Sequence, residues 1–172
     1  SVAHREAAAF GLGQIANPAA IRALHGFVED ASPSIRALAC IGLGRSGEAR
    51  HLETLVTRFQ SDESEYVRAS AAWALGFIDS PEVSPHLIRA LRSGPLMVRR
   101  ASAWALGARD DRLGRRELAT ALFDEDRSLR EVAAWALRRA GSGALQPELG
   151  MSYHRMPSGH LRLTAYLEDL LR

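Results

Sequence analysis

The stretch VRASAAWALG at residues 67–76 decides the fold, because related stretches recur along the chain. The other copies are HREAAAFGLG from His4, IRALACIGLG from Ile35, VRRASAWALG from Val98 and LREVAAWALR from Leu129. Successive copies start 31, 32, 31 and 31 residues apart. A fixed period of this length is typical of an array in which every repeat is one supersecondary unit.

Each copy has the apolar spacing of a helix, since Val67, Ala71 and Ala74 fall on one face at about 100° per residue. A second, shorter pattern lies between the copies and places two apolar residues four positions apart. Its pairs are Leu24 and Val28, Leu55 and Phe59, Leu87 and Leu91, and Leu118 and Leu122. Two helices per repeat, joined by short turns, predict an antiparallel helical pair.

One helical pair cannot bury both of its apolar sides, so neighbouring pairs must stack. The sequence therefore predicts an all-α fold, a right-handed α-solenoid of about five hairpin repeats. We expect the repeat array to span residues 1–141, with repeat helices that start near residues 4, 35, 67, 98 and 129.

Capping residues mark the expected ends of these helices. Ser32, Ser64, Pro95 and Asp126 suit helix starts. Gly44, Gly76 and Gly107 close the repeated stretches, and we expect them to end the helices in the left-handed conformation that favours glycine.

The composition fits a single domain with a buried core. The chain has 172 residues and a net charge of +2, and all 22 of its basic residues are arginines. The single cysteine, Cys40, stands in a column of alanines, which predicts a small buried side chain. No apolar run is long enough for a membrane span. We expect a cytoplasmic protein of bacterial origin, and a chain that is a piece of a longer protein.

The positive excess falls in residues 95–142, which hold 10 arginines and 7 acidic residues. This excess is small compared with the basic stripe of a nucleic-acid-binding protein, so nucleic acid is an unlikely partner.

Arginine recurs at one position of every repeat, and an acidic residue stands six positions before it in most of them. The set comprises Arg36, Arg68, Arg99 and Arg130 with Asp30, Asp62 and Asp124. We interpret it as a structural ladder in which each guanidinium binds the carboxylate of its turn and the carbonyls of the neighbouring turn. The alternative is a row of anion-binding arginines. The fourth repeat has Ser93 and Gly94 instead of the acid, so Arg99 is either freer or paired with another repeat.

The stretches EDASPSIRALACIGLG, SDESEYVRASAAWALG and GPLMVRRASAWALG resemble the short HEAT-like repeats named after phycobilisome lyases. The resemblance covers residues 1 to about 141. That family includes bilin lyases, a hydroxylase of a modified lysine and many noncatalytic scaffolds, and related arrays are DNA glycosylases. Membership alone does not select a function.

An aromatic column is the most informative feature for function. Phe10, Trp73, Trp104 and Trp135 share one repeat position, with Ile41 in the second repeat. The resemblance implies that this column lines the inner, concave surface, and the helix period places it off the main core seam. Neighbouring indoles would then lie one helix spacing, about 8–10 Å, apart. They form either an open apolar strip for a partner or rings packed against adjacent alanines.

We expect a noncatalytic scaffold that binds a protein or peptide segment through this column, together with Arg100 and Arg138. No phosphate loop, paired cysteines or nucleophile elbow occurs in the sequence, so we predict no catalytic residue, metal or cofactor. We expect the histidines of the repeats, His25 and His51 among them, at surface or turn positions. The alternatives are a bilin lyase subunit or chaperone that binds a tetrapyrrole on the tryptophans, and a nucleic-acid-binding module.

Residues 142–172 depart from the repeat pattern. They begin with a stretch rich in glycine and proline and end in TAYLEDLLR, which has the spacing of an amphipathic helix. We expect an irregular linker and a C-terminal helix that caps the last repeat.

Overall fold

A computed structural model describes residues 1–15, 17–110 and 112–140, so the expected linker and capping helix lie outside the described residues. Within these ranges the chain forms nine α-helices, one 3-10 turn (Ala49–His51) and no strand. The helices are α1 (Val2–Gly13), α2 (Pro18–Phe27), α3 (Pro33–Arg45), α4 (Leu52–Ser61), α5 (Glu65–Leu75), α6 (Val83–Ser93), α7 (Leu96–Arg109), α8 (Arg112–Ala121) and α9 (Arg127–Ala140).

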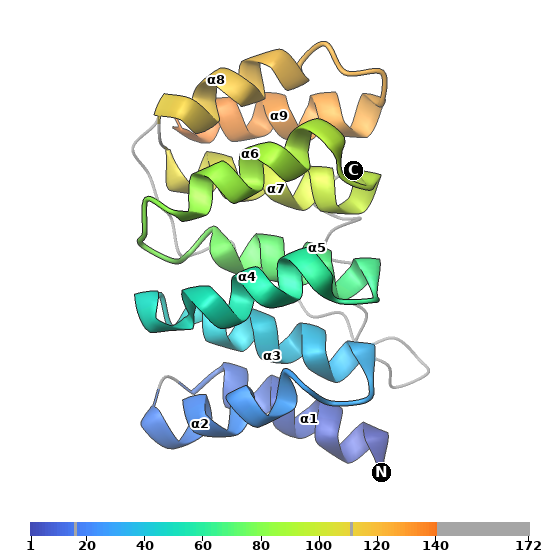
Figure 1. Cartoon of the computed structure of the whole chain (residues 1–172), viewed down its shortest axis with the longest axis vertical. Helices are drawn as coiled ribbons and strands as arrows, with labels where there is room; N and C mark the ends of the chain where they lie inside the picture. Colours follow the sequence, from blue (N-terminus) through green and yellow to red (C-terminus); the bar gives the residue numbers. More distant parts are fainter. Residues whose placement is uncertain (16, 111, 141–172) are drawn as a thin grey trace.

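The helices form two layers that run along the long axis of the molecule (Figure 1). The odd-numbered helices pack closely against one another, and each also contacts an even-numbered neighbour. The even-numbered helices contact each other much less, mainly between α6 and α8. We call the closely packed odd-numbered helices the inner layer and the others the outer layer. The arrangement is an all-α solenoid of helical hairpins, as the repeat predicted.

Glycine allows the close approach of the inner helices. A Cβ added at Gly44 would lie 2.5 Å from the Cβ of Ala74, and one added at Gly107 would lie 2.5 Å from the Cβ of Ala136. At the first junction, a Cβ added at Gly42 would lie 2.9 Å from the Cα of Gly13. Any side chain at these positions would force the helices apart.

The prediction that these glycines end helices in a left-handed conformation is therefore wrong. Gly44 and Gly107 lie inside α3 and α7, and Gly76 has a φ of −59°. Among the described residues, the positive-φ positions are Gly47 at 69° and Asp110 at 49°. Gly44 and Gly107 serve helix packing instead of helix termination, whereas Gly76 does end α5 as its C-cap residue, in a right-handed conformation.

The predicted helix starts coincide with the observed ones, but the capping chemistry differs. Ser32 and Ser64 are N-cap residues with extended backbones, yet neither side chain caps its helix. Instead, the carboxylates of Asp30 and Asp62 accept hydrogen bonds from the backbone N–H groups of these serines, at 2.8 and 3.0 Å. The ladder acids thus also hold the turns that lead into the inner helices.

Leucines of the outer helices anchor that layer to the inner one. Leu24, Leu55, Leu87 and Leu118 are completely buried, in agreement with the second apolar pattern. Cys40 is also completely buried, and its desolvation raises the pKa of the thiol to about 12. At neutral pH this cysteine is a small protonated core residue, as its place in the alanine column predicted. No helix in the described ranges is long and apolar enough to cross a membrane.

The close approach of the inner helices generates a first prediction. Gly107→Ala should lower the free energy of unfolding by about 1–3 kcal/mol, because the new methyl overlaps Ala136. Gly11→Ala in α1 is the matched control, since a Cβ there meets nothing within 4 Å. It should raise stability by about 0.5–1 kcal/mol through helix propensity. Urea unfolding measures both variants, and a Gly107→Ala protein as stable as the wild type would contradict the glycine contact.

Candidate functional site

Three tryptophans from successive inner helices stack face to face. The ring centroids of Trp73 on α5 and Trp104 on α7 lie 5.2 Å apart with an interplanar angle of 22°. Trp104 and Trp135 on α9 lie 6.2 Å apart at 12°. Phe77 packs edge-on against Trp73 at 4.5 Å and lies 5.5 Å from Trp104. We call these four residues the inner-face aromatic cluster.

The cluster is mostly closed to solvent. Trp73 and Trp104 are each only 6% exposed, so the prediction that they present open rings in a groove is wrong, and the packed alternative holds for both. The rings are also closer than one helix spacing, because the glycine contacts bring the helices together and the indoles lean onto one another. Trp135 is half-buried and Phe77 is 38% exposed, so the cluster keeps accessible parts at these two residues.

The other predicted binding residues are divided between the two ends of the inner layer. Phe10 lies with a separate small core of Ala9, Ile35 and Leu38, at the N-terminal end. Ile41, between Phe10 and Trp73 in the column, is buried. The stacked rings join Trp73 to Trp104 and Trp104 to Trp135.

The last two inner helices, which carry the C-terminal end of the cluster, also carry arginines. The guanidinium of Arg139 lies 5.5 Å from the ring centroid of Trp135, a cation–π distance. Arg138 is exposed in the last turn of α9, and Arg100 is half-buried on α7. This end of the inner face combines aromatic surface with positive charge.

The indole N–H of Trp104 is buried without a hydrogen-bond acceptor among the described residues. A buried donor left unpaired costs about 1–3 kcal/mol relative to a paired one. The sequence could not reveal this feature, because it depends on which way the ring leans.

The arginine column forms a ladder between successive repeats. Nε and Nη2 of Arg36 donate to the two carboxylate oxygens of Asp62, each at 2.9 Å. Nη1 of Arg36 donates to the backbone oxygens of Asp30 and Ala31 in its own turn, at 2.9 and 3.2 Å. Arg5 binds the two carboxylate oxygens of Asp30 in the same manner, whereas Arg99 binds those of Asp124 through Nη1 and Nη2.

The predicted ladder exists, but the roles of the two turns are exchanged. Where an arginine binds a carboxylate, as Arg5, Arg36 and Arg99 do, that carboxylate belongs to the following repeat. The carbonyls of its own turn are bound by Arg36, Arg68 and Arg130. Arg99 is paired with the acid of the neighbouring repeat, which was one of the two expected alternatives. Because the fourth repeat has no acid at this position, Arg68 of the third repeat has no carboxylate to bind. Among the described residues, Arg68 donates only to the carbonyls of Asp62 and Glu63. Arg130 likewise contacts only its own turn, at the carbonyls of Asp124 and Glu125.

Each arginine–aspartate pair is one rung of the ladder, and the pair of Arg36 and Asp62 is the most buried. Their side chains are 7% and 1% exposed, whereas the side chain of Arg5 in the first rung is 42% exposed. Burial alone would raise the pKa of Asp62, but hydrogen bonds from Arg36 and the Ser64 N–H hold the pKa below its ordinary value. Asp62 is therefore ionised at neutral pH and is bound by a fixed guanidinium.

Two histidines lie in a place that the sequence did not predict. His51 is completely buried and pairs with His25 through Nδ1 and Nε2, which lie 3.0 Å apart. Desolvation, aided by the nearby His25, lowers the pKa of His51. His51 lies in a turn (Ala49–His51), as expected, but this turn packs against His25 of α2, so the side chain of His51 is buried and not at the surface. A lone histidine in a single repeat gives no periodic signal of burial.

The repeated, glycine-packed hairpin defines an α-solenoid repeat protein. The family model described as HEAT repeats matches residues 1–76 and again residues 25–107, which together include more than half of the chain. The chain therefore belongs to the HEAT repeat family, whose members typically serve as scaffolds for protein interactions. A comparison with curated proteins found no match.

The buried rung generates a second prediction. Asp62→Ala should cost up to about 3–5 kcal/mol of unfolding free energy, because it leaves the buried Arg36 with only the largely exposed carboxylate of Glu63, 3.2 Å away, as a counter-ion. Asp30→Ala is the matched control, since Asp30 makes the same turn contact but pairs with the half-exposed Arg5. It should cost at least about 2 kcal/mol less.

The difference in unfolding free energy between the wild type and Asp62→Ala depends on pH. A lowered carboxylate pKa stabilises the fold above the unfolded-state value of 3.8, and this stabilisation is lost as the pH falls through the lower folded-state pKa. The difference between the wild type and Asp62→Ala should shrink in that acidic range. Equal costs for the two variants at neutral pH would contradict the importance of burial.

The indole stack generates a third prediction. Trp104→Ala should cost about 3–5 kcal/mol, because it removes a buried ring that contacts two other indoles. Phe123→Ala is the control, since Phe123 is 88% exposed and should change stability by less than about 0.5 kcal/mol. Thermal unfolding of both variants tests the packing, and a Trp104→Ala protein that unfolds like the control would indicate an exposed ring.

Proposed function

We propose that this protein is a noncatalytic scaffold that binds a segment of another protein across the C-terminal half of its inner face. The observation that supports this proposal best is the accessible part of the inner-face aromatic cluster. Phe77 and Trp135 are partly exposed on top of two buried indoles. Aromatic residues held rigidly in this way lose little side-chain entropy on binding and are frequent in binding hot spots.

Charge around the cluster indicates the chemistry of the partner. Arg138 is exposed beside Arg139, which lies over Trp135, and Arg100 is on the neighbouring helix. A partner segment would place its apolar side chains on Trp135 and Phe77. Its acidic side chains would lie near Arg138.

The shape of the inner layer supports a bound polypeptide as well. The inner layer of a solenoid also offers an extended surface without a deep cavity, which suits a chain segment. Trp73, Trp104, Trp135, Arg100 and Arg138 thus remain our candidate partner-binding residues, with Trp73 and Trp104 acting mainly as support. Phe10, in the separate core at the N-terminal end, lies outside this proposed site.

A peptide-display selection on the intact chain tests the proposal and is our fourth prediction. Selected peptides should carry aromatic or aliphatic residues together with acidic ones. Their affinity should fall about tenfold or more for the double variant Trp135→Ala, Arg138→Glu. Phe123→Ala, which removes an exposed aromatic ring from a loop, is the control and should bind as the wild type does. Selected peptides that bind the double variant and the wild type equally well would contradict an inner-face site.

A further inference from the structure

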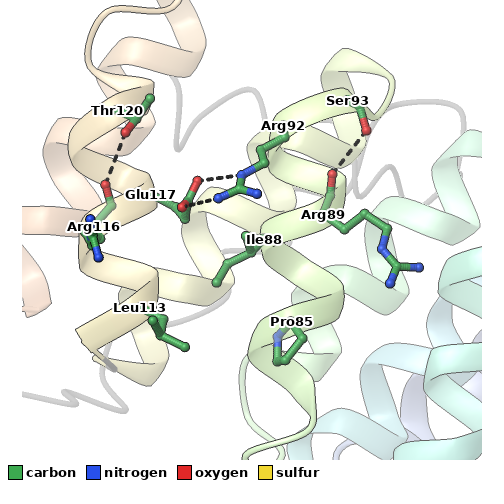
Figure 2. A pocket seen from close by; sticks show the side chains of 9 residues that line it. All are labelled: Pro85, Ile88, Arg89, Arg92, Ser93, Leu113, Arg116, Glu117 and Thr120. Atoms are coloured by element: carbon green, nitrogen blue, oxygen red, sulfur yellow. Dashed lines mark hydrogen bonds and ion pairs between the residues drawn. The ribbon is translucent and has the colours of Figure 1, made fainter.

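A groove of about 720 Å³ separates the outer helices α6 and α8, on the layer opposite to the inner-face aromatic cluster. Figure 2 shows Ile88 of α6 and Leu113 of α8 projecting toward the space between the two helices. Pro85 extends this apolar surface on α6. Leu113 is 59% exposed, which is unusual for a leucine in a helix that has a completely buried leucine on its other face.

The groove arises from the packing of the two layers. Glycine and alanine bring the inner helices together, while the outer helices spread apart and are linked by single polar pairs. Arg58 of α4 binds Glu29 at 3.0 Å, and Gln60 of α4 contacts His86 of α6 at 3.0 Å. The side chains that join α6 to α8 are polar as well. Because they do not pack over the apolar surface of the groove, that surface is left uncovered.

That link is an ion pair at one end of the groove. Nε and Nη2 of Arg92 donate to the two carboxylate oxygens of Glu117, at 2.9 and 2.5 Å (Figure 2). The hydrogen bond from Arg92 lowers the pKa of Glu117, so the carboxylate is ionised and already engaged at neutral pH. It therefore adds little free negative charge to the groove.

The remaining charge of the groove is positive. Arg89 on α6 and Arg116 on α8 also line it, and neither forms an ion pair with a described residue. Arg89 extends away from α8, so these two arginines flank the apolar centre on its outer sides (Figure 2). With Arg92 and Glu117 cancelling one another, the lining carries two uncompensated positive charges.

We propose that this groove binds an acidic segment of a partner protein that crosses α6 and α8. An apolar side chain of the segment contacts Ile88 and Leu113, and carboxylates on either side of it pair with Arg89 and Arg116. Nucleic acid fits the same positive charge less well, because the centre of the groove is aliphatic and offers no aromatic ring on which a base can stack. This second surface is separate from the inner-face site and does not depend on it.

Fluorescence anisotropy with a synthetic peptide tests this inference and is our fifth prediction. The probe is a labelled peptide of about 12 residues with two central leucines and glutamates on both sides. It should bind the intact chain saturably, and more weakly at about 300 than at about 50 mM NaCl, because exposed charges are screened. Peptides with glutamine for glutamate, or serine for leucine, should each bind at least several-fold more weakly.

Variants of the groove locate the binding. The double variant Arg89→Glu, Arg116→Glu should lose about tenfold or more in affinity, and Leu113→Ser should lose several-fold without loss of folding, since its side chain is exposed. Arg22→Glu, an exposed arginine on α2, is the matched charge control and should bind like the wild type.

Three results would overturn the inference: no saturable binding of the acidic peptide, equal binding by the groove variants and the wild type, or tighter binding of a labelled single-stranded oligonucleotide that the same variants abolish. The inner-face double variant Trp135→Ala, Arg138→Glu should leave binding of the acidic peptide unchanged. Failure at the groove is therefore distinguishable from failure at the inner face.

Discussion

The close approach of the inner helices is the constraint on which the other features of this protein depend. Where Gly44 meets Ala74 and Gly107 meets Ala136, there is no room for even one additional carbon atom. This contact sets the distance over which the tryptophans stack and brings each arginine within reach of the next repeat's carboxylate. It also determines that the outer helices, which carry larger side chains, diverge.

The ladder and the aromatic stack link neighbouring repeats at different places. The ladder joins the turns before the inner helices, through pairs such as Arg36 with Asp62, while the indoles join the middle of those helices. A repeat protein has few contacts between distant parts of its chain, so its integrity depends on every junction between neighbours. At the junction between α7 and α9 both links occur, since Arg99 binds Asp124 and Trp104 stacks on Trp135, so a wrong register there would separate both sets of partners.

Periodicity predicted the fold because it is a local property of the sequence. The helix pairs, the buried leucines of the outer layer and the helix starts at Ser32 and Ser64 follow from spacing and capping preferences alone. The register of the ladder did not follow, because Asp62 is six residues from Arg68 in the chain but binds Arg36 in space.

The sequence alone also could not predict how exposed the tryptophans are. A helical wheel gives the direction in which Trp73 leaves its helix, but not the way in which the ring then leans onto Trp104. The glycines had two possible uses, helix termination and close packing, and only the position of the next helix distinguishes them. The groove at Leu113 could not be predicted either, because an exposed leucine and a buried one can have the same spacing in the sequence.

The junction between α5 and α7 differs from its neighbours in the bonds that cross it. Arg68 has no carboxylate there, and a Cβ added at Gly76 would lie 3.1 Å from Ala105, a looser fit than at the junctions on either side. The stacking of Trp73 on Trp104 and the hydrogen bonds from Arg109 of α7 to the backbone oxygens of Ile78 and Ser80 hold this junction instead. Its cohesion thus rests on ring contact and neutral acceptors, so added salt should weaken it less than the junctions that are closed by ion pairs.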